Sequence, residues 1–191
     1  MNRRPARAYI GLGSNRGDPV AQLRRALAAL GGLPASRLQA VSPFYVSAPM
    51  GRRNQSPFIN AVAALDTALA PMSLLRALQR IEAAQGRRRG RRHWGPRPLD
   101  LDLLLYGARR VRTARLQVPH PRLSQRAFVL RPLCDVAPGV RVPPRQRRAR
   151  AWLRRLGSQR VAALVAPTGT LTALESAVAG TSAQWPQSAG P

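Results

Sequence analysis

The sequence has no lysine, one cysteine (Cys134), and only seven acidic residues against thirty-two basic ones. A single cysteine excludes an internal disulfide and any zinc or iron-sulfur site built from several thiolates. The absence of lysine excludes the Gly-Lys-Ser/Thr phosphate loop, and the pair Gly11 and Gly13 lacks the third glycine of a dinucleotide-binding fingerprint. Any binding of phosphate must therefore use a different arrangement of side chains.

Long apolar runs are also missing. No stretch has the length and apolarity of a membrane span, and glycines interrupt the apolar residues after the N-terminal arginines too soon for a signal-peptide core. We therefore expect a cytoplasmic protein with no membrane partner. A chain of 191 residues with 45% hydrophobic residues fits one domain, which we assign to residues 1–160. Residues 161–191 are expected to be a largely disordered C-terminal extension, because the last part is rich in Gly, Ser, Pro and Gln.

The formal net charge is +25, and every basic residue is an arginine. Such a surplus attracts polyanions: nucleic acid, an anionic membrane, or a small molecule that carries phosphate. Charge alone does not choose among them, and genomic base composition explains the exclusive use of arginine equally well. A basic nucleic-acid-binding module is therefore the competing hypothesis, and it predicts an affinity that falls steeply with salt.

Apolar periodicity predicts the main elements. Asp18 is placed to cap a helix that has Pro19 at its first position. The spacing predicts helices at 19–30, 72–85 and 124–133, a last amphipathic helix within 141–160, and strands at 7–12, 38–45, 58–67, 99–106 and 109–112. Strands and helices interleave without the strict alternation of a doubly wound sheet. The expected class is therefore α+β, with helices on a mainly antiparallel sheet.

Two carboxylates, Asp100 and Asp102, stand two positions apart inside a run of leucines. In a strand such residues project from the same face, where they can share cations, and magnesium prefers oxygen ligands and keeps phosphates in its shell. The alternative is an exposed pair on a sheet edge. Glu82 follows Leu78 by one helical turn, so it lies beside the apolar stripe of its helix rather than opposite it.

Arginines and aromatic residues complete the candidate chemistry. Arg87, Arg89 and Arg97 flank the aspartates, and guanidinium groups bind phosphate oxygens in a bidentate way, which together with metal ions is typical of phosphoryl transfer. Each arginine could equally be a solvated loop charge. Phe58 and Phe128 could form two walls of an aromatic slot or belong to the core.

The segment 92–104 resembles the signature of 6-hydroxymethyl-7,8-dihydropterin pyrophosphokinases, enzymes of folate biosynthesis. It reads Trp-Gly-Pro-Arg, two further residues, then Asp-Leu-Asp-Leu-Leu. The opening strand over 8–15, the Val-Pro-His-Pro segment at 118–121 and the Arg-Ala-Phe segment at 126–128 are similar to other motifs of that family, in consistent order.

The resemblance implies a ferredoxin-like three-layer α/β/α sandwich and an ATP-dependent diphosphotransferase that gives the pterin diphosphate and AMP. It implies that Asp100 and Asp102 hold two Mg2+ ions, and that Arg87 and Arg97 join them as catalytic residues. For ATP it implies Glu82, Arg89, Trp94, Arg115, His120 and Arg126, and for the pterin it implies Ser47, Ala48, Met50, Phe58, Asn60 and Phe128. Its partners would be the small molecules ATP and hydroxymethyl dihydropterin, with no specific nucleic acid, and the protein would be a monomer.

Overall fold

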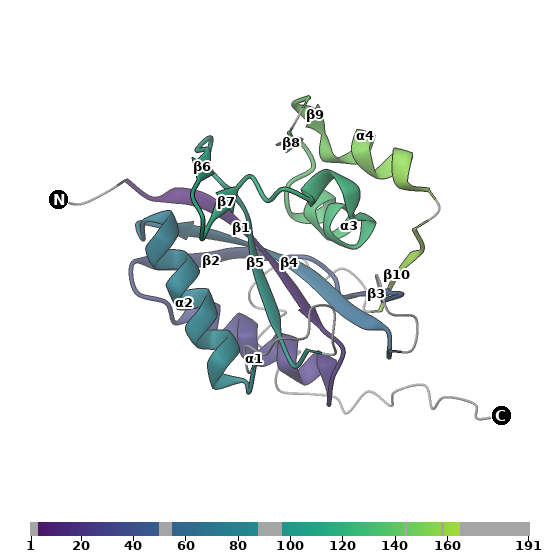
Figure 1. The fold of residues 1–191 in the computed structure, drawn as a ribbon, viewed down its shortest axis with the longest axis horizontal. Coiled ribbons are helices and arrows are strands. Elements are labelled where there is room, and N and C mark those ends of the chain that lie inside the picture. Colours follow the sequence, from purple (N-terminus) through teal and green to yellow (C-terminus); the bar gives the residue numbers. More distant parts are fainter. Residues whose placement is uncertain (1–3, 50–54, 88–96, 144, 158, 165–191) are drawn as a thin grey trace.

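The structure is a computed structural model that describes residues 4–49, 55–87, 97–143, 145–157 and 159–164. A six-stranded sheet runs through its centre, with helices on both faces (Figure 1). The strands of this sheet are β1 (Ala6–Ser14), β2 (Ser36–Val41), β3 (Tyr45–Ser47), β4 (Phe58–Thr67), β5 (Asp100–Tyr106) and β10 (Val161–Ala163). The helices are α1 (Pro19–Gly31), α2 (Pro71–Ala84), α3 (Ala127–Val136) and α4 (Ala149–Leu153), with 3-10 turns η1 (Leu123–Gln125) and η2 (Arg154–Leu156).

The strands follow the order β10-β3-β4-β1-β5, β2 pairs with β4, and all these pairs are antiparallel. Two small hairpins lie outside the sheet: β6 (Val111–Arg112) with β7 (Gln117–Val118), and β8 (Arg141–Val142) with β9 (Arg147–Arg148). Figure 1 shows α1 and α2 on one face of the sheet and α3 and α4 on the other. The expected α+β architecture with a mainly antiparallel sheet between helical layers is confirmed.

Alternation along the strands divides the core between the two faces. Ile10 and Ile59 pack with α1 and α2 in one buried cluster, whereas Val62 packs with Leu130 of α3 in a second cluster. A bulge where β1 pairs with β5 turns two successive β5 residues, Leu104 and Leu105, toward the second cluster. The period of two before this bulge places Asp100 and Asp102 on the α3 side of the sheet.

None of the helices within the described part of the chain is long and apolar enough to cross a membrane.

The first half of the chain follows its local pattern closely. Helix α1 begins after Asp18, whose Oδ1 accepts a hydrogen bond from Ala21 N at 3.0 Å, and Pro71 opens α2. The single strand predicted over 38–45 is wrong, because residues 42–44 interrupt it and leave β2 and β3 as separate partners of β4. Pro43 has no N–H for a sheet bond, while Ser42 N donates to Val62 O at 2.9 Å and keeps the two strands aligned.

The second half departs further from the predicted elements. The helix predicted over 124–133 with Ser124 as its cap is displaced, since residues 123–125 form η1 and α3 begins at Ala127. The last amphipathic helix predicted within 141–160 is present only over its apolar stripe, where Ala149 to Leu156 form α4 and η2, while residues 141–142 and 147–148 form β8 and β9. Residues 161–163, assigned from sequence to the C-terminal extension, form β10 and pair with β3.

Replacing Asp18 with alanine should lower the free energy of unfolding by about 1 kcal/mol, because α1 loses the side-chain acceptor at its N-terminus. Asp18→Asn keeps an acceptor oxygen and serves as the matched control. Urea unfolding of the three proteins measures the difference. Equal stability of the wild type and Asp18→Ala would show that this cap does not stabilise the fold.

Candidate active site

A cavity of about 280 Å³ lies where β1 ends and β4 and β5 begin, between the sheet and α3. Gly11 and Gly13 form part of its wall. A Cβ at Gly11 would lie 3.3 Å from a methyl carbon of Leu104, and a Cβ at Gly13 would lie 3.5 Å from Asn60 Oδ1. The glycine pair therefore keeps this space open next to the backbone of β1. The cavity is lined by residues from distant segments: Gly11, Leu12, Gly13, Ser47, Ala48, Gln55, Phe58, Asn60, Ala61, Arg97, Asp100, Asp102, Leu104, Arg122, Arg126, Phe128 and Val129.

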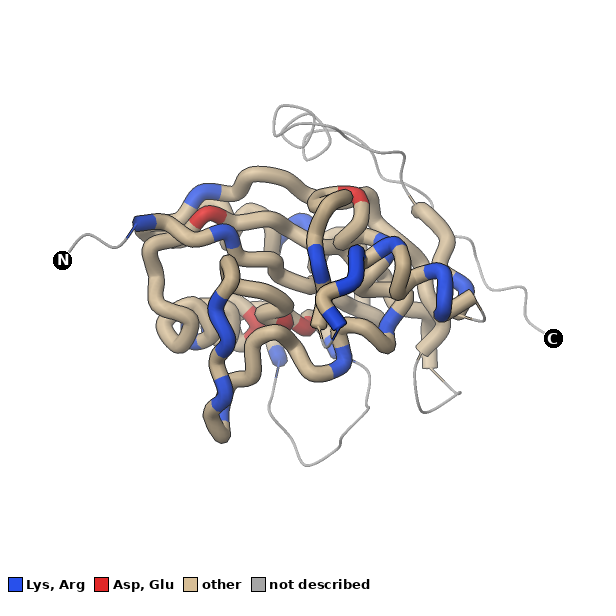
Figure 2. Tube along the Cα trace, turned by 90° about the horizontal axis from the view of Figure 1, so that it is seen from above, with Lys and Arg blue, Asp and Glu red and all other residues tan. Residues whose placement is uncertain are grey.

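Charge is distributed unevenly around this cavity. Figure 2 shows arginines spread over many elements, with acidic segments grouped together near the middle of the trace. The grouped acidic residues are Glu82, Asp100 and Asp102, of which both aspartates line the cavity. Such grouping brings like charges together, so it needs cations beside it.

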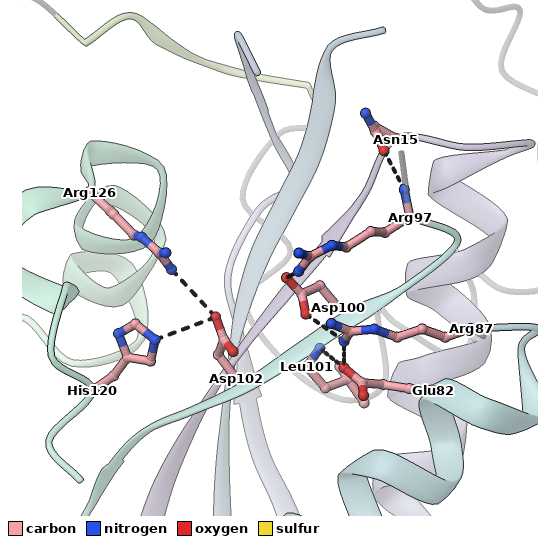
Figure 3. A network of polar contacts seen from close by, with 9 residues as sticks. All are labelled: Asn15, Glu82, Arg87, Arg97, Asp100, Leu101, Asp102, His120 and Arg126. Carbon is pink, nitrogen blue, oxygen red and sulfur yellow. Dashed lines mark hydrogen bonds and ion pairs between the residues drawn. The ribbon is translucent and has the colours of Figure 1, made fainter. Parts of the chain in front are cut away.

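Asp100 is held by two arginines (Figure 3). Arg87 Nη1 lies 2.5 Å from Asp100 Oδ1, and Arg97 Nη1 lies 2.8 Å from Asp100 Oδ2. Both carboxylate oxygens therefore accept charge-assisted hydrogen bonds. The same Nη1 of Arg87 also donates to Glu82 Oε1, so one guanidinium joins the end of α2 to the start of β5.

Glu82 is only 4% exposed. Its Oε1 accepts a hydrogen bond from Leu101 N at 2.8 Å, which fixes β5 between the two aspartates. Burial raises the pKa of Glu82 to about 7, although the Leu101 N–H and the Arg87 guanidinium both favour the ionised carboxylate. The protonated and ionised forms of the Glu82 carboxyl are therefore both populated near neutral pH.

Asp102 faces α3 and the segment before it. Its Oδ2 lies 3.5 Å from Arg126 Nη1 and 3.9 Å from His120 Nε2. The Asp102 side chain is 36% exposed, toward the cavity that it lines, yet the surrounding protein removes enough water to raise its pKa to about 6, and the charge of Asp100 adds to this rise. A cation in the cavity would relieve both effects.

His120 is neutral at pH 7. Burial and the nearby charge of Arg126 lower its pKa to about 4. Its Nδ1 accepts a hydrogen bond from Arg122 N at 3.2 Å, so the proton of the neutral ring is on Nε2, which faces Asp102.

The donor set at Asp100 and Asp102 fits magnesium better than a metal held entirely by protein. Within the described residues no group of three His, Cys, Asp or Glu side chains could hold a metal ion. Two carboxylates on one strand face are nevertheless the ligands that Mg2+ uses when water and substrate phosphates complete its shell. An ion at Asp100 would have to replace the arginine contacts that its oxygens now make.

The part of the cavity formed by Asn60, Phe58 and Phe128 has fewer charged groups than the part around the two aspartates. Asn60 is 4% exposed, and its Nδ2 donates to Ser47 Oγ at 3.0 Å and to Tyr45 O at 3.4 Å, which orients the amide. Phe58 on β4 and Phe128 on α3 both line the cavity. The Arg126 guanidinium carbon lies 5.7 Å from the centre of the Phe128 ring. This region can take a flat polar ring.

The structure brings together most of the residues proposed from sequence, but not all of them. Ser47, Ala48, Phe58, Asn60, Arg97, Asp100, Asp102, Arg126 and Phe128 line one cavity. Three further proposed residues do not line the cavity but adjoin this group. Arg87 pairs with both Asp100 and Glu82, and His120 lies near Asp102. Arg115 instead lies on the exposed turn between β6 and β7 and is not among the residues that line the cavity. Met50, Arg89 and Trp94 lie outside the described residues.

Sequence reasoning missed Asn15, which organises the rim. Its Oδ1 accepts from Arg97 N at 2.8 Å, and its Nδ2 donates to Gln55 Oε1 and Ser56 O, both at 3.3 Å. Asn15 therefore links the end of β1 to two segments that border the cavity. Its position directly after the Gly-Leu-Gly-Ser end of the first strand was the available signal.

Comparison with protein families identifies the family of this chain. The family model described as 7,8-dihydro-6-hydroxymethylpterin-pyrophosphokinase (HPPK) matches residues 9–138, which include every residue that lines the cavity. The chain belongs to the HPPK family. The resemblance seen in the motifs is therefore confirmed.

Curated HPPK relatives match over most of their length. The chain is 55% identical over 137 residues to the 2-amino-4-hydroxy-6-hydroxymethyldihydropteridine pyrophosphokinase of Pseudomonas aeruginosa, which covers 72% of this chain and 84% of that protein. It is 48% identical over 139 residues to the enzyme of the same name from Haemophilus influenzae, which covers 73% of this chain and 86% of that protein.

Among solved structures, the chain is similar to wild-type Plasmodium falciparum HPPK-DHPS crystallised with pterin and p-hydroxybenzoate. The TM-score is 0.63 at 13% identity, over 82% of this chain and 44% of that chain. At this identity the likeness shows the HPPK fold alone. The chain spans less than half of that longer protein.

The HPPK cavity should make stability depend on pH through Glu82. Because its folded-state pKa is raised from 4.5 to about 7, the folded protein binds more protons than the unfolded chain in this window, and the free energy of unfolding falls as pH rises through it. Glu82→Gln removes the titration and keeps an acceptor for Leu101 N. We expect the stability of Glu82→Gln relative to wild type to rise by about 3 kcal/mol between about pH 4.5 and pH 8.

Urea unfolding at several pH values, with chelator present, measures this difference. Groups outside the site titrate alike in both proteins, so subtraction isolates Glu82 together with its charge interactions with Asp100 and Asp102. A difference that stays constant across the pH range would contradict the raised pKa.

Proposed function

We propose that this chain transfers pyrophosphate from ATP to the hydroxymethyl oxygen of 6-hydroxymethyl-7,8-dihydropterin, giving the pterin diphosphate and AMP in folate biosynthesis. One observation carries the proposal: Asp100 and Asp102 line the same cavity as Phe58 and Phe128. This cavity lies within the range that matches the HPPK family. Carboxylates for a metal and aromatic walls for a ring are the two requirements of this reaction.

Asp100 and Asp102 would hold two Mg2+ ions. The chemistry that such ions would supply is neutralisation of the charge that develops during phosphoryl transfer. The raised pKa of Asp102 supports this role, because a carboxylate short of compensating charge gains most from a cation.

Arg87 and Arg97 would serve the phosphates. Both guanidinium groups now bind Asp100, and Arg97 also has its backbone N–H fixed by Asn15. If the Asp100 carboxylate binds a metal ion, the guanidinium groups that now contact it can bind phosphate oxygens instead. A positively charged group held beside the phosphates stabilises the negative charge of the transition state. These arginines would therefore exchange an internal partner for substrate.

For the nucleotide we propose Glu82, Arg89, Trp94, Arg115, His120 and Arg126. Arg126 and His120 are already placed on the Asp102 side of the cavity. Since His120 is neutral, it can donate from Nε2 without adding a further positive charge to a site that has several.

The pterin would lie between Phe58 and Phe128, near Ser47, Ala48, Met50 and Asn60. Aromatic rings on two sides suit a flat heterocycle. The Asn60 amide is held by Ser47, so it can present a fixed polar edge to the ring. We propose that ATP and the pterin are the partners of a monomer that works in the cytoplasm.

The competing nucleic-acid hypothesis has less support. Its motivation was net charge, but the cavity is where acidic residues gather, and carboxylates repel phosphodiesters unless a cation intervenes. No described contact favours a nucleic acid over the nucleotide.

The direct test is AMP formation. The purified chain should release AMP from ATP only when both 6-hydroxymethyl-7,8-dihydropterin and Mg2+ are present. Chromatographic measurement of AMP decides this. AMP production without the pterin, or none with it, would reject the proposal.

Asp102→Asn should lower kcat by about 10²- to 10³-fold, because the substitution keeps the volume and removes the charge that a metal needs. Asp66→Asn is the matched control, since Asp66 pairs with Arg7 on the surface, away from the cavity. Circular dichroism checks the fold of both. Wild-type turnover in Asp102→Asn would exclude Asp102 as a metal ligand.

Phe58→Leu should raise KM for the pterin about 10-fold while KM for ATP is unchanged, since stacking of one ring on an aromatic side chain contributes about 1–3 kcal/mol. Phe58→Tyr keeps the ring and is the control. Steady-state kinetics with each substrate varied in turn separates the two. A larger effect on ATP would place Phe58 outside the pterin slot.

A further inference from the structure

Helix α3 begins without a capping side chain of its own. Arg126 occupies the N-cap position, and its guanidinium has no acceptor atom. The first turn also contains no acidic residue. Ala127, the first residue of the helix, is 1% exposed, so its N–H has little access to water. A buried N–H without an acceptor would destabilise this end of the helix.

Gln159 supplies the acceptor from 32 residues farther along the chain. Its Oε1 accepts from Ala127 N at 2.9 Å, and its Nε2 donates to Gln125 O at 3.0 Å. These backbone groups belong to the two peptide planes on either side of Arg126. One amide therefore restrains both planes and holds Arg126 in its extended conformation, with φ of −123° and ψ of 104°.

The backbone that Gln159 restrains carries two side chains that line the cavity, Arg126 and Phe128. Arg126 Nη1 lies 3.5 Å from Asp102 Oδ2, and its guanidinium carbon lies 5.7 Å from the centre of the Phe128 ring. Arg126 is the residue between the two bonded planes, and Phe128 follows Ala127 directly. A rotation of either plane would move both side chains within the cavity.

Gln159 is itself held by the sheet. Gln159 N donates to Leu156 O at 2.9 Å, and β10 begins two residues later. Val161 pairs with Ser47 of β3, and Leu164 N donates to Phe44 O at 2.6 Å. We call residues 159–164 the strap; Figure 1 shows its strand β10 beside β3. The strap lies beyond the range 9–138 that matches the family model, and it joins α3 to the strand that carries Ser47.

We propose that Gln159 is a positioning residue for the pyrophosphoryl transfer: its amide sets where the Arg126 guanidinium and the Phe128 ring lie in the cavity. The proposal rests on the proposed function for the reaction that is served. Gln159 does not line this cavity, so its effect passes through the backbone around Arg126.

Two variants separate positioning from simple stability. Gln159→Ala removes both hydrogen bonds. Gln159→Glu keeps an acceptor for Ala127 N and places negative charge at a helix N-terminus, which is favourable, but it cannot donate to Gln125 O above its pKa. The favourable charge at the helix N-terminus opposes the loss of the hydrogen bond to Gln125 O, so Gln159→Glu should melt near the wild-type temperature and still be impaired in catalysis.

At about pH 8 we expect kcat/KM for the pterin to fall about 10- to 100-fold in Gln159→Ala, as when a supporting contact of a catalytic group is lost. In Gln159→Glu we expect a smaller fall, of about 3- to 10-fold, because one of the two bonds remains. Hydrogen exchange of the Ala127 amide should be faster than wild type in the alanine variant only. Arg160→Ala, an exposed neighbour on the strap, should match wild type in every measurement.

Unchanged kinetic constants in both Gln159 variants, measured well below their melting temperatures, would overturn the proposal. If Gln159→Ala does not fold, Gln159→Glu decides alone: a lowered kcat/KM for the pterin at a melting temperature near that of the wild type supports positioning, and wild-type kinetics rejects it. If the wild type forms no AMP, the proposed function itself fails. If the wild type is active and the variants are equally active, only the role of Gln159 fails.

Discussion

The arrangement of this site depends on keeping three carboxyl groups close together against an apolar sheet. Uncompensated charge in such a place costs several kcal/mol. Arg87 compensates it by joining Glu82 to Asp100, and Leu101 N adds a hydrogen bond to the same glutamate. These contacts tie the end of α2 to the start of β5. The charge balance of the site and the alignment of helix and strand are therefore one structural feature.

The two faces of the sheet differ in how completely they are packed. The face toward α1 and α2 is filled by aliphatic side chains such as Ile10, Ile59 and Leu78. The face toward α3 is filled only in part, because Gly11 and Gly13, which line the cavity on that face, have no side chains. A packed layer on one side thus supports an open cavity on the other, and the aspartates of β5 reach that cavity by strand alternation.

Local sequence patterns predicted the longer strand and helices in the first half of the chain. The apolar run within 58–67 and the helical spacing over 19–30 and 72–85 correspond to β4, α1 and α2 within a residue or two. The region after 120 was predicted poorly for a physical reason. Strands β8 and β9 are too short to show a period, and α4 is oriented by contacts such as Trp152 Nε1 to Val142 O, at 3.2 Å, that follow from tertiary packing.

The sequence by itself determined that Asp100 and Asp102 share one face, that Glu82 lies beside a buried stripe, and that the motifs around them belong to the HPPK family. Periodicity and motif spacing are properties of neighbouring residues, so they are readable along the chain. Only the tertiary structure decided that Arg126 reaches Asp102, that Asn15 fixes Arg97, and that Gln159 closes the start of α3. These pairs are separated by 24, 82 and 32 residues, and how such distant segments meet depends on the packing of the whole sheet and its helices.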